Sequence, residues 1–167
     1  MSSEQSLKRI WASGPFDLEG LPAAVEQLIP VLSAVLRPVD EERIPAGVVA
    51  LKGEMGAGKT TLVKALCAAW NVVEDAVSPT FALVQSYLGQ NRTIYHLDLY
   101  RLKNEEEAWD LGLTEYFDGE ELNFVEWPER APGILPEDAV LLEVDVNGLH
   151  VDGTRELYLS IPHELRM

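Results

Sequence analysis

Residues 53–60 constrain the fold of this 167-residue chain more than any other stretch. Their sequence, GEMGAGKT, is that of a P-loop: a glycine, four residues, and Gly-Lys followed by serine or threonine. A P-loop works only where a β-strand turns into an α-helix, because its backbone N–H groups and the helix N-terminus bind phosphate together. The apolar residues 48–51 and the helix-like residues 61–70 flank it as that turn requires. The chain is therefore predicted to bind a nucleoside triphosphate.

The P-loop also predicts two side-chain roles. Lys59 would lie along the β- and γ-phosphates, and the hydroxyl of Thr60 would ligate Mg²⁺. Phosphoryl transfer needs further metal ligands and a group that orients the attacking oxygen. Glu126, which ends the predicted strand 122–126, is placed as a Walker-B acid that reaches Mg²⁺; an ordinary carboxylate at a strand end is the alternative.

Two further segments contain candidate residues. Strand alternation places His96, Asp98 and Tyr100 on one face, although such a polar row can simply be solvated and a lone histidine is more often structural. Thr80 lies in a turn after the P-loop, where the threonine of a switch-bearing NTPase senses the γ-phosphate and Mg²⁺. Trp127 is either a core or hinge aromatic or an interaction residue, and the sequence does not choose between them.

The remaining pattern predicts a three-layer α/β P-loop NTPase domain with a central mixed β-sheet, spanning residues 1–167. Residues 1–15 are expected to be a flexible N-terminal extension, and residues 37–46 a charged loop. Pro30 should kink or divide the helix predicted at residues 21–36. Strands are predicted at residues 47–52, 81–88, 92–99, 122–126, 139–146 and 155–161, and helical segments at residues 104–111 and 113–117.

The composition limits the possible partners. The net charge is −15, from 28 acidic and 13 basic residues, so direct binding to nucleic acid is not expected. The acidic surface serves either solubility or docking on a basic protein. Cys67 is the only cysteine, which excludes an internal disulfide. No apolar run of the roughly 18 residues of a membrane span and no signal-peptide core are predicted, so a cytoplasmic location is expected.

Five motifs in order resemble the TsaE family, also called YjeE, the ATPase of the bacterial system that makes threonylcarbamoyladenosine beside the tRNA anticodon. They are GEMGAGKTT at 53–61, SPTF at 78–81, HLDLYR at 96–101, EWP at 126–128 and GILP at 133–136. The resemblance runs from about residue 18 to residue 161 and leaves out residues 1–15 and 37–46.

The resemblance implies ATP and Mg²⁺ as cofactors, and it assigns roles to individual residues. Asp98 would be needed for hydrolysis, Thr80 matches a switch-like turn, and Arg155 matches a basic position that contacts nucleotide. The residues implied to contact phosphates are Gly56, Ala57, Gly58, Lys59, Thr60 and Thr61; those implied to ligate Mg²⁺ are Thr60 and Glu126. The implied partners are TsaD and TsaB, with tRNA reached only through them. The predicted activity is a Mg²⁺-dependent ATPase that is weak without these partners.

Three other functions stay open at this point. A small-molecule kinase shares the P-loop, but only Arg130 is available for the arginine-rich lid that such enzymes close. A GTPase is disfavoured because the chain has no Asn-Lys-x-Asp motif. An adaptor that binds nucleotide without hydrolysing it is disfavoured by the carboxylates Asp98 and Glu126.

Overall fold

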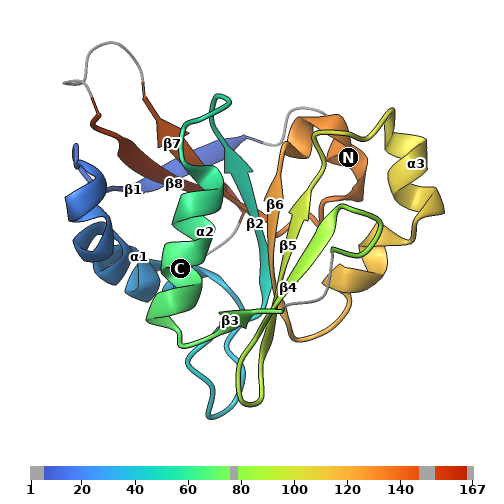
Figure 1. Ribbon diagram of the computed structural model, residues 1–167, viewed down its shortest axis with the longest axis horizontal. Coiled ribbons are helices and arrows are strands. Elements are labelled where there is room, and N and C mark those ends of the chain that lie inside the picture. The colour runs from blue at the N-terminus through green and yellow to red at the C-terminus, as the bar shows by residue number, and fades with distance from the viewer. Residues whose placement is uncertain (1–5, 76–78, 147–152, 165–167) are drawn as a thin grey trace.

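The computed structural model describes residues 6–75, 79–146 and 153–164. Within these residues eight strands form one mixed sheet, in the order β1-β8-β7-β2-β6-β5-β4-β3 (Figure 1). The strands are β1 (Leu7–Ala12), β2 (Gly47–Lys52), β3 (Val73–Glu74), β4 (Val84–Leu88), β5 (Thr93–Asp98), β6 (Leu122–Glu126), β7 (Val140–Asp145) and β8 (Glu156–Pro162). All six predicted strands are present, with small shifts at their ends, whereas β1 and the two-residue β3 were not predicted.

Four central strands determine where the site lies. β7, β2, β6 and β5 are parallel, and β8, β1, β4 and β3 are added antiparallel at the edges. β2 and β6 are buried at almost every position, as expected for parallel strands covered on both faces. Because parallel strands end at the same edge, the carboxyl ends of β2, β6 and β5 meet there.

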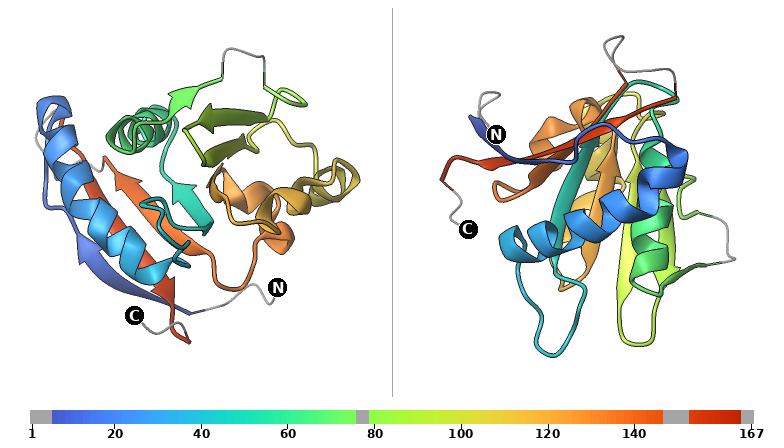
Figure 2. Two further views of the ribbon diagram at one scale, coloured as in Figure 1. Left: turned by 90° about the horizontal axis from the view of Figure 1, so that it is seen from below. Right: turned by 90° about the vertical axis from the view of Figure 1, so that its left-hand side faces the viewer.

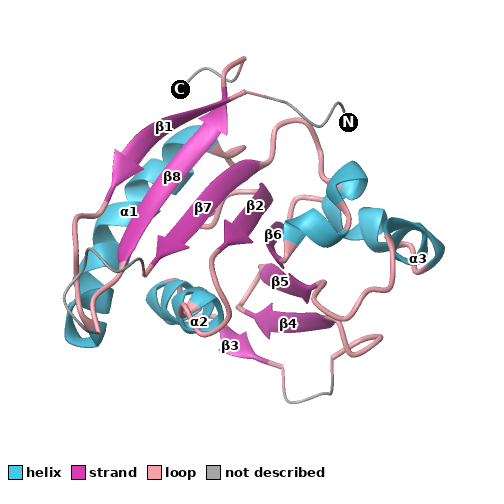
Figure 3. Ribbon diagram, turned by 90° about the horizontal axis from the view of Figure 1, so that it is seen from above, coloured by secondary structure: helices cyan, strands magenta, loops and turns pink. Residues whose placement is uncertain are grey.

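Helices cover both faces of the sheet and make the three-layer arrangement that the sequence predicted. α1 (Leu21–Val35) and α2 (Lys59–Ala69) lie on one face of the sheet (Figure 2), and their buried side chains belong to the larger core cluster. On the other face lies α3 (Glu105–Asp110) (Figure 3). The 3-10 turns are η1 (Leu18–Gly20), η2 (Leu113–Phe117), η3 (Pro128–Arg130) and η4 (Pro132–Ile134). α3, η2 and η4 contribute Ala108, Leu113 and Ile134 to a second core cluster.

The N-terminal residues differ from the prediction of a flexible extension over residues 1–15. Leu7–Ala12 forms β1 and pairs antiparallel with β8, from Leu7 opposite Pro162 to Ala12 opposite Tyr158. Trp11 packs against the main core. A strand whose only partner is some 150 positions away leaves no local signal in the sequence, which explains the wrong prediction. Residues 1–5 lie outside the described residues.

α1 differs from prediction in two respects. It runs unbroken through Pro30, which is exposed, so water can reach the carbonyl that lacks a helical N–H partner. Leu28 and Leu32, both fully buried, hold the helix to the core on either side of the proline. Residues 18–35 also have the length and apolar composition of a membrane span, with a mean hydropathy of 1.3, which was not expected. Here the apolar face of α1 packs on α2 and the sheet, as in a core helix.

Candidate active site

The P-loop joins the end of β2 to the start of α2, at the carboxyl edge of the parallel strands. Gly56 and Gly58 have φ angles of 80° and 105°, in the left-handed region that glycine adopts without strain. Gly58 is also the N-cap residue of α2, so the loop leads directly into the helix N-terminus. The partial positive charge of that terminus favours a bound anion.

One cavity of about 320 Å³ brings together side chains from three neighbouring strand ends. The P-loop and the first turn of α2 form one wall, and the ends of β5 and β6 form the other. Its lining residues are Met55, Gly56, Gly58, Lys59, Thr60, Thr61, Asp98, Tyr100, Glu126 and Trp127. The structure therefore gathers most of the residues predicted to contact nucleotide and metal.

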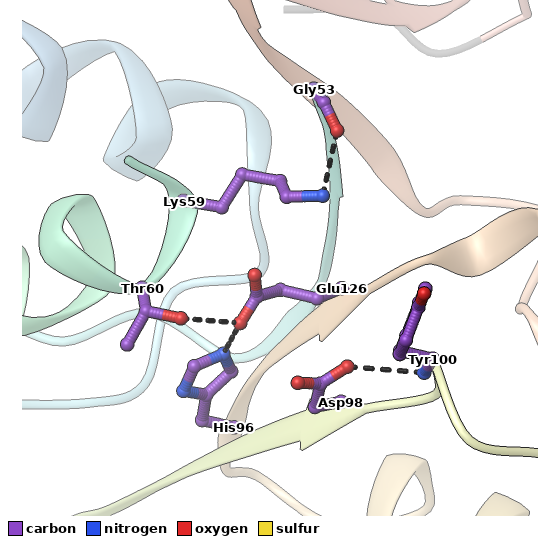
Figure 4. A network of polar contacts seen from close by, with 7 residues as sticks. All are labelled: Gly53, Lys59, Thr60, His96, Asp98, Tyr100 and Glu126. Atoms are coloured by element: carbon purple, nitrogen blue, oxygen red, sulfur yellow. Dashed lines mark hydrogen bonds and ion pairs between the residues drawn. The ribbon is translucent and has the colours of Figure 1, made fainter. Parts of the chain in front are cut away.

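Glu126 lies at the centre of this edge. Its Cα is opposite Leu51 of β2 on one side and Asp98 of β5 on the other. The side chain is only 4% exposed, and its Oε2 accepts hydrogen bonds from Thr60 Oγ1 at 2.9 Å and from His96 Nε2 at 2.5 Å (Figure 4). The predicted metal ligands Thr60 and Glu126 are thus in direct contact.

The surroundings of Glu126 favour its ionised form. Burial of the carboxyl is the largest single influence on its pKa and acts to raise it. The hydrogen bond and charge of His96, the hydrogen bond from Thr60 and the charge of Lys59 together outweigh burial, and the pKa of Glu126 is lowered. A carboxylate in this state can accept a cation.

Lys59 is held against the P-loop itself. It is 5% exposed, and its Nζ donates a hydrogen bond to the carbonyl of Gly53 at 2.7 Å. The same ammonium lies 3.8 Å from the centroid of the Trp127 ring, a cation–π contact. Trp127 follows Glu126 with a left-handed φ of 57°, which turns the chain at the end of β6.

Asp98 lies at the exposed rim of the cavity. Its Oδ1 accepts the backbone N–H of Tyr100 at 3.1 Å, and the Tyr100 ring lies 5.1 Å from that of Trp127. The backbone N–H of Asp98 donates to the carbonyl of Leu83 at 2.9 Å. Asp98 is therefore a fixed, solvent-accessible carboxylate beside Glu126.

Arg155 lies on the other side of the P-loop. Its Nε donates to the carbonyl of Ala57 at 2.8 Å, which ties the start of β8 to the loop. Arg155 and Ala57 line a second cavity of about 370 Å³, which Gly56, Gly58 and Thr61 also line. The apolar side chains around it are Phe16, Leu18, Leu21, Leu62, Val144 and Leu157. An apolar cavity next to a phosphate-binding loop has the character that a flat, aromatic base requires.

Thr80 is placed differently from the other predicted site residues. It lines a separate cavity with Phe81 and Glu115, in the turn before β4. Phe81 and Ala82 have left-handed φ angles of 56° and 57°, which are costly for residues with a side chain. The carbonyl of Leu83, which ends this turn, accepts the Asp98 N–H, so the turn and the cavity are connected through one hydrogen bond. Ser78, predicted to belong to the same turn, lies outside the described residues.

Sequence reasoning undervalued two residues of the site, His96 and Trp127. His96 bonds Glu126, and Trp127 covers Lys59. His96 shares a strand face with Asp98, but its importance depends on β5 lying next to β6, which the sequence alone does not show. Trp127 follows the predicted Walker-B residue directly, and that adjacency was the one available signal.

The donors present fit a nucleotide-bound Mg²⁺ better than a metal held by protein alone. Within residues 6–75, 79–146 and 153–164, no group of three or more His, Cys, Asp or Glu side chains is placed to hold a metal ion. Mg²⁺ in nucleotide sites is bound by one or two protein oxygens together with phosphate oxygens and water. The Thr60 hydroxyl and the Glu126 carboxylate, 2.9 Å apart, provide two such oxygens.

Three similar proteins of known sequence carry one name. The relatives from Treponema pallidum, Bacillus subtilis and Haemophilus influenzae are each called tRNA threonylcarbamoyladenosine biosynthesis protein TsaE. The first is 40% identical over 113 residues, covering 68% of this chain and 81% of its own length, and the second is 35% identical over 113 residues, covering 68% of each. The third is 40% identical over 95 residues, so the match spans 57% of this chain and 60% of that relative.

A solved structure shares the fold of this chain, and a family model points to the same family as these relatives. The crystal structure of Bacillus subtilis YdiB superposes on this chain with a TM-score of 0.65 and 24% identity, covering 95% of this chain and 89% of YdiB, which shows a common fold. The family model for the threonylcarbamoyl adenosine biosynthesis protein TsaE matches residues 22–156. Since that match covers well over half of the chain, and the P-loop and its neighbouring motifs lie within it, this protein belongs to the TsaE family.

Proposed function

We propose that this protein is a cytoplasmic, Mg²⁺-dependent ATPase that acts with TsaD and TsaB to support threonylcarbamoyladenosine formation on the anticodon-loop adenosine of tRNA. The observation that carries the proposal is the hydrogen bond between Thr60 and Glu126 beside the P-loop lysine, Lys59. A strand-end carboxylate, a P-loop hydroxyl and a buried ammonium in one cavity are the groups that nucleotide-dependent phosphoryl transfer requires.

Each group has a separate task. The P-loop backbone from Gly56 to Thr61 and the ammonium of Lys59 hold the phosphates, while the apolar cavity beside Arg155 takes the base. Thr60 and Glu126 would hold Mg²⁺, which would supply positive charge to the phosphates during transfer. Asp98, exposed at the rim, orients the attacking water, and Thr80 reports the state of the γ-phosphate through the turn that bonds Asp98.

The open rim of the site supports the proposal that activity is weak in isolation. Asp98 lies at an open rim, so water is not excluded from it until a further surface covers the cavity. A partner that closes this rim would strengthen the electrostatic contacts inside. The net charge of −15 suits docking on a basic protein surface and disfavours direct contact with tRNA.

The test measures phosphate release from ATP and Mg²⁺ by the purified protein, alone and with TsaD and TsaB. We expect slow release that the pair accelerates, and recovery of both proteins from a native extract in an ATP-dependent manner. Lys59→Ala should abolish release, whereas Lys64→Ala, an exposed lysine on the same helix, should not. Turnover that appears only with a small-molecule acceptor would instead identify a kinase.

A further inference from the structure

A buried histidine contacts the carboxylate at the centre of the site. His96 lies on β5 opposite Phe124 of β6 and is 6% exposed. Residues two apart on a strand share a face, so β5 directs His96 and Asp98 to the face on which Glu126 lies. The Nε2 of His96 is 2.5 Å from Oε2 of Glu126. An ionised carboxylate can only accept, so this nitrogen carries the proton of the hydrogen bond.

Stability alone does not explain this contact. Both side chains are almost fully buried, and well-packed apolar residues in place of a buried hydrogen-bonded polar pair often stabilise a fold as much or more. Ile94, the preceding residue on the same face of β5, is a fully buried apolar residue of this kind. The physical effect of His96 is therefore best sought in what it does to Glu126.

The two hydrogen bonds of Glu126 end on one oxygen. Thr60 and His96 both donate to Oε2, and the other carboxylate oxygen points to the side on which Lys59 lies (Figure 4). The terminal torsion of a glutamate has broad, roughly two-fold preferences, so a carboxylate without such donors can rotate. Two donors from different elements, α2 and β5, determine which oxygen is turned toward the P-loop.

We propose that His96 is a positioning residue for the metal site: it holds Oε2 of Glu126 so that the other oxygen is presented to Mg²⁺. The inference rests on the proposed function, in which Thr60 and Glu126 hold that ion. Outer hydrogen bonds of this kind orient metal ligands, and their loss typically costs about 10- to 100-fold in metal affinity.

Three variants separate positioning from packing. His96→Gln keeps a donor nitrogen at nearly the reach of Nε2, whereas His96→Asn is shorter by one carbon and cannot reach Glu126. Asn123→Ala is the matched control, because Asn123 is a 1%-exposed polar residue of β6 that points to the opposite face and donates to the Tyr116 carbonyl at 3.0 Å. Its loss disturbs β6, the strand that carries Glu126, without changing a residue of the site.

The measurement is calorimetric binding of ATP in EDTA and at increasing Mg²⁺, together with thermal unfolding of each variant. We expect His96→Asn to raise the Mg²⁺ concentration for half-maximal binding by about 10- to 100-fold while binding in EDTA is unchanged. His96→Gln should restore the wild-type midpoint. Asn123→Ala should lower the melting temperature without moving the Mg²⁺ midpoint.

Several results would overturn the proposal. A wild-type Mg²⁺ midpoint in His96→Asn, or an equal shift in Asn123→Ala, would make the role of His96 purely structural. If His96→Asn does not fold, His96→Gln alone decides. A Mg²⁺ midpoint of His96→Gln displaced as far as that of Glu126→Gln would contradict positioning through Nε2. A separate outcome is that ATP binding by the wild-type protein does not depend on the Mg²⁺ concentration. This result would remove the proposed metal site and the role of His96 with it.

Discussion

Replacing Glu126 by glutamine is the sharpest test of the site, because the structure determines how the amide must lie. Thr60 and His96 both donate to Oε2, so the amide oxygen must take that position to accept their hydrogen bonds. The NH₂ group is then turned toward the P-loop, where it is a donor and cannot ligate a cation. Glu126→Gln thus keeps the shape of the site and replaces the metal-facing oxygen.

The effect on the fold should be small. A hydrogen bond to a charged group contributes about 1.5–3 kcal/mol and a neutral one about 0.5–1.5 kcal/mol, so the two bonds together weaken by about 2–3 kcal/mol. This loss is offset because a 4%-exposed charge no longer has to be desolvated, which in proteins costs several kcal/mol. The effect on turnover should be large, about 100- to 1,000-fold or roughly 3–4 kcal/mol, as for loss of one preorganised charge contact.

Two assays on Glu126→Gln give the answer. Phosphate release at saturating ATP and Mg²⁺ should fall by the factor given above, while calorimetric binding of ATP in EDTA should persist or tighten, because a negative charge has left the cavity. Circular dichroism and thermal unfolding check that the fold is retained. Wild-type turnover in a folded Glu126→Gln variant would refute the assignment of this carboxylate to the metal.

Three further predictions follow from the same geometry. Lys59→Ala should weaken ATP binding by roughly 10- to 100-fold, since the ammonium is a charged donor worth about 1.5–3 kcal/mol, and calorimetry against Lys64→Ala measures it. Asp98→Asn should bind ATP normally but release phosphate about 100-fold more slowly, whereas Asp110→Asn, also exposed, should not. The lowered pKa of Glu126 stabilises the fold above the ordinary glutamate pKa of 4.5, and this contribution is lost as the pH falls through the lowered value. The difference in melting temperature between wild type and Glu126→Gln should therefore change in that acidic range and stay constant above it.

The parts of the fold that the sequence predicted well are those with local signals. β2, the P-loop and α2 are consecutive, so apolar run, glycine spacing and helical periodicity can be read together. β6 was predicted with the correct bounds because a short apolar run ends in a carboxylate. The individual residues Glu126, Asp98 and Thr60 were predicted, but their meeting in one cavity depends on β2, β6 and β5 being parallel neighbours, which the structure supplies.

The parts that it missed depend on contacts between distant segments. β1 forms because Leu7–Ala12 pairs with the edge of β8, and no residue near it in the sequence predicts that pairing. His96 matters because β5 and β6 are neighbours in register, which places a histidine beside a glutamate thirty positions away. Pro30 does not divide α1, and its position on the exposed side of that helix depends on how the helix packs, which the sequence does not show.

The stack of Trp127 on Lys59 gives the protein an internal optical probe. Indole fluorescence responds to nearby charge, and here a single ammonium lies 3.8 Å from the ring at the point where phosphate would arrive. An anion that draws this ammonium toward itself changes the electric field at the indole without any chemical label. Because the chain has four tryptophans, a variant that keeps only Trp127 would be needed for its emission to follow the position of this one lysine, and with it the filling of the P-loop.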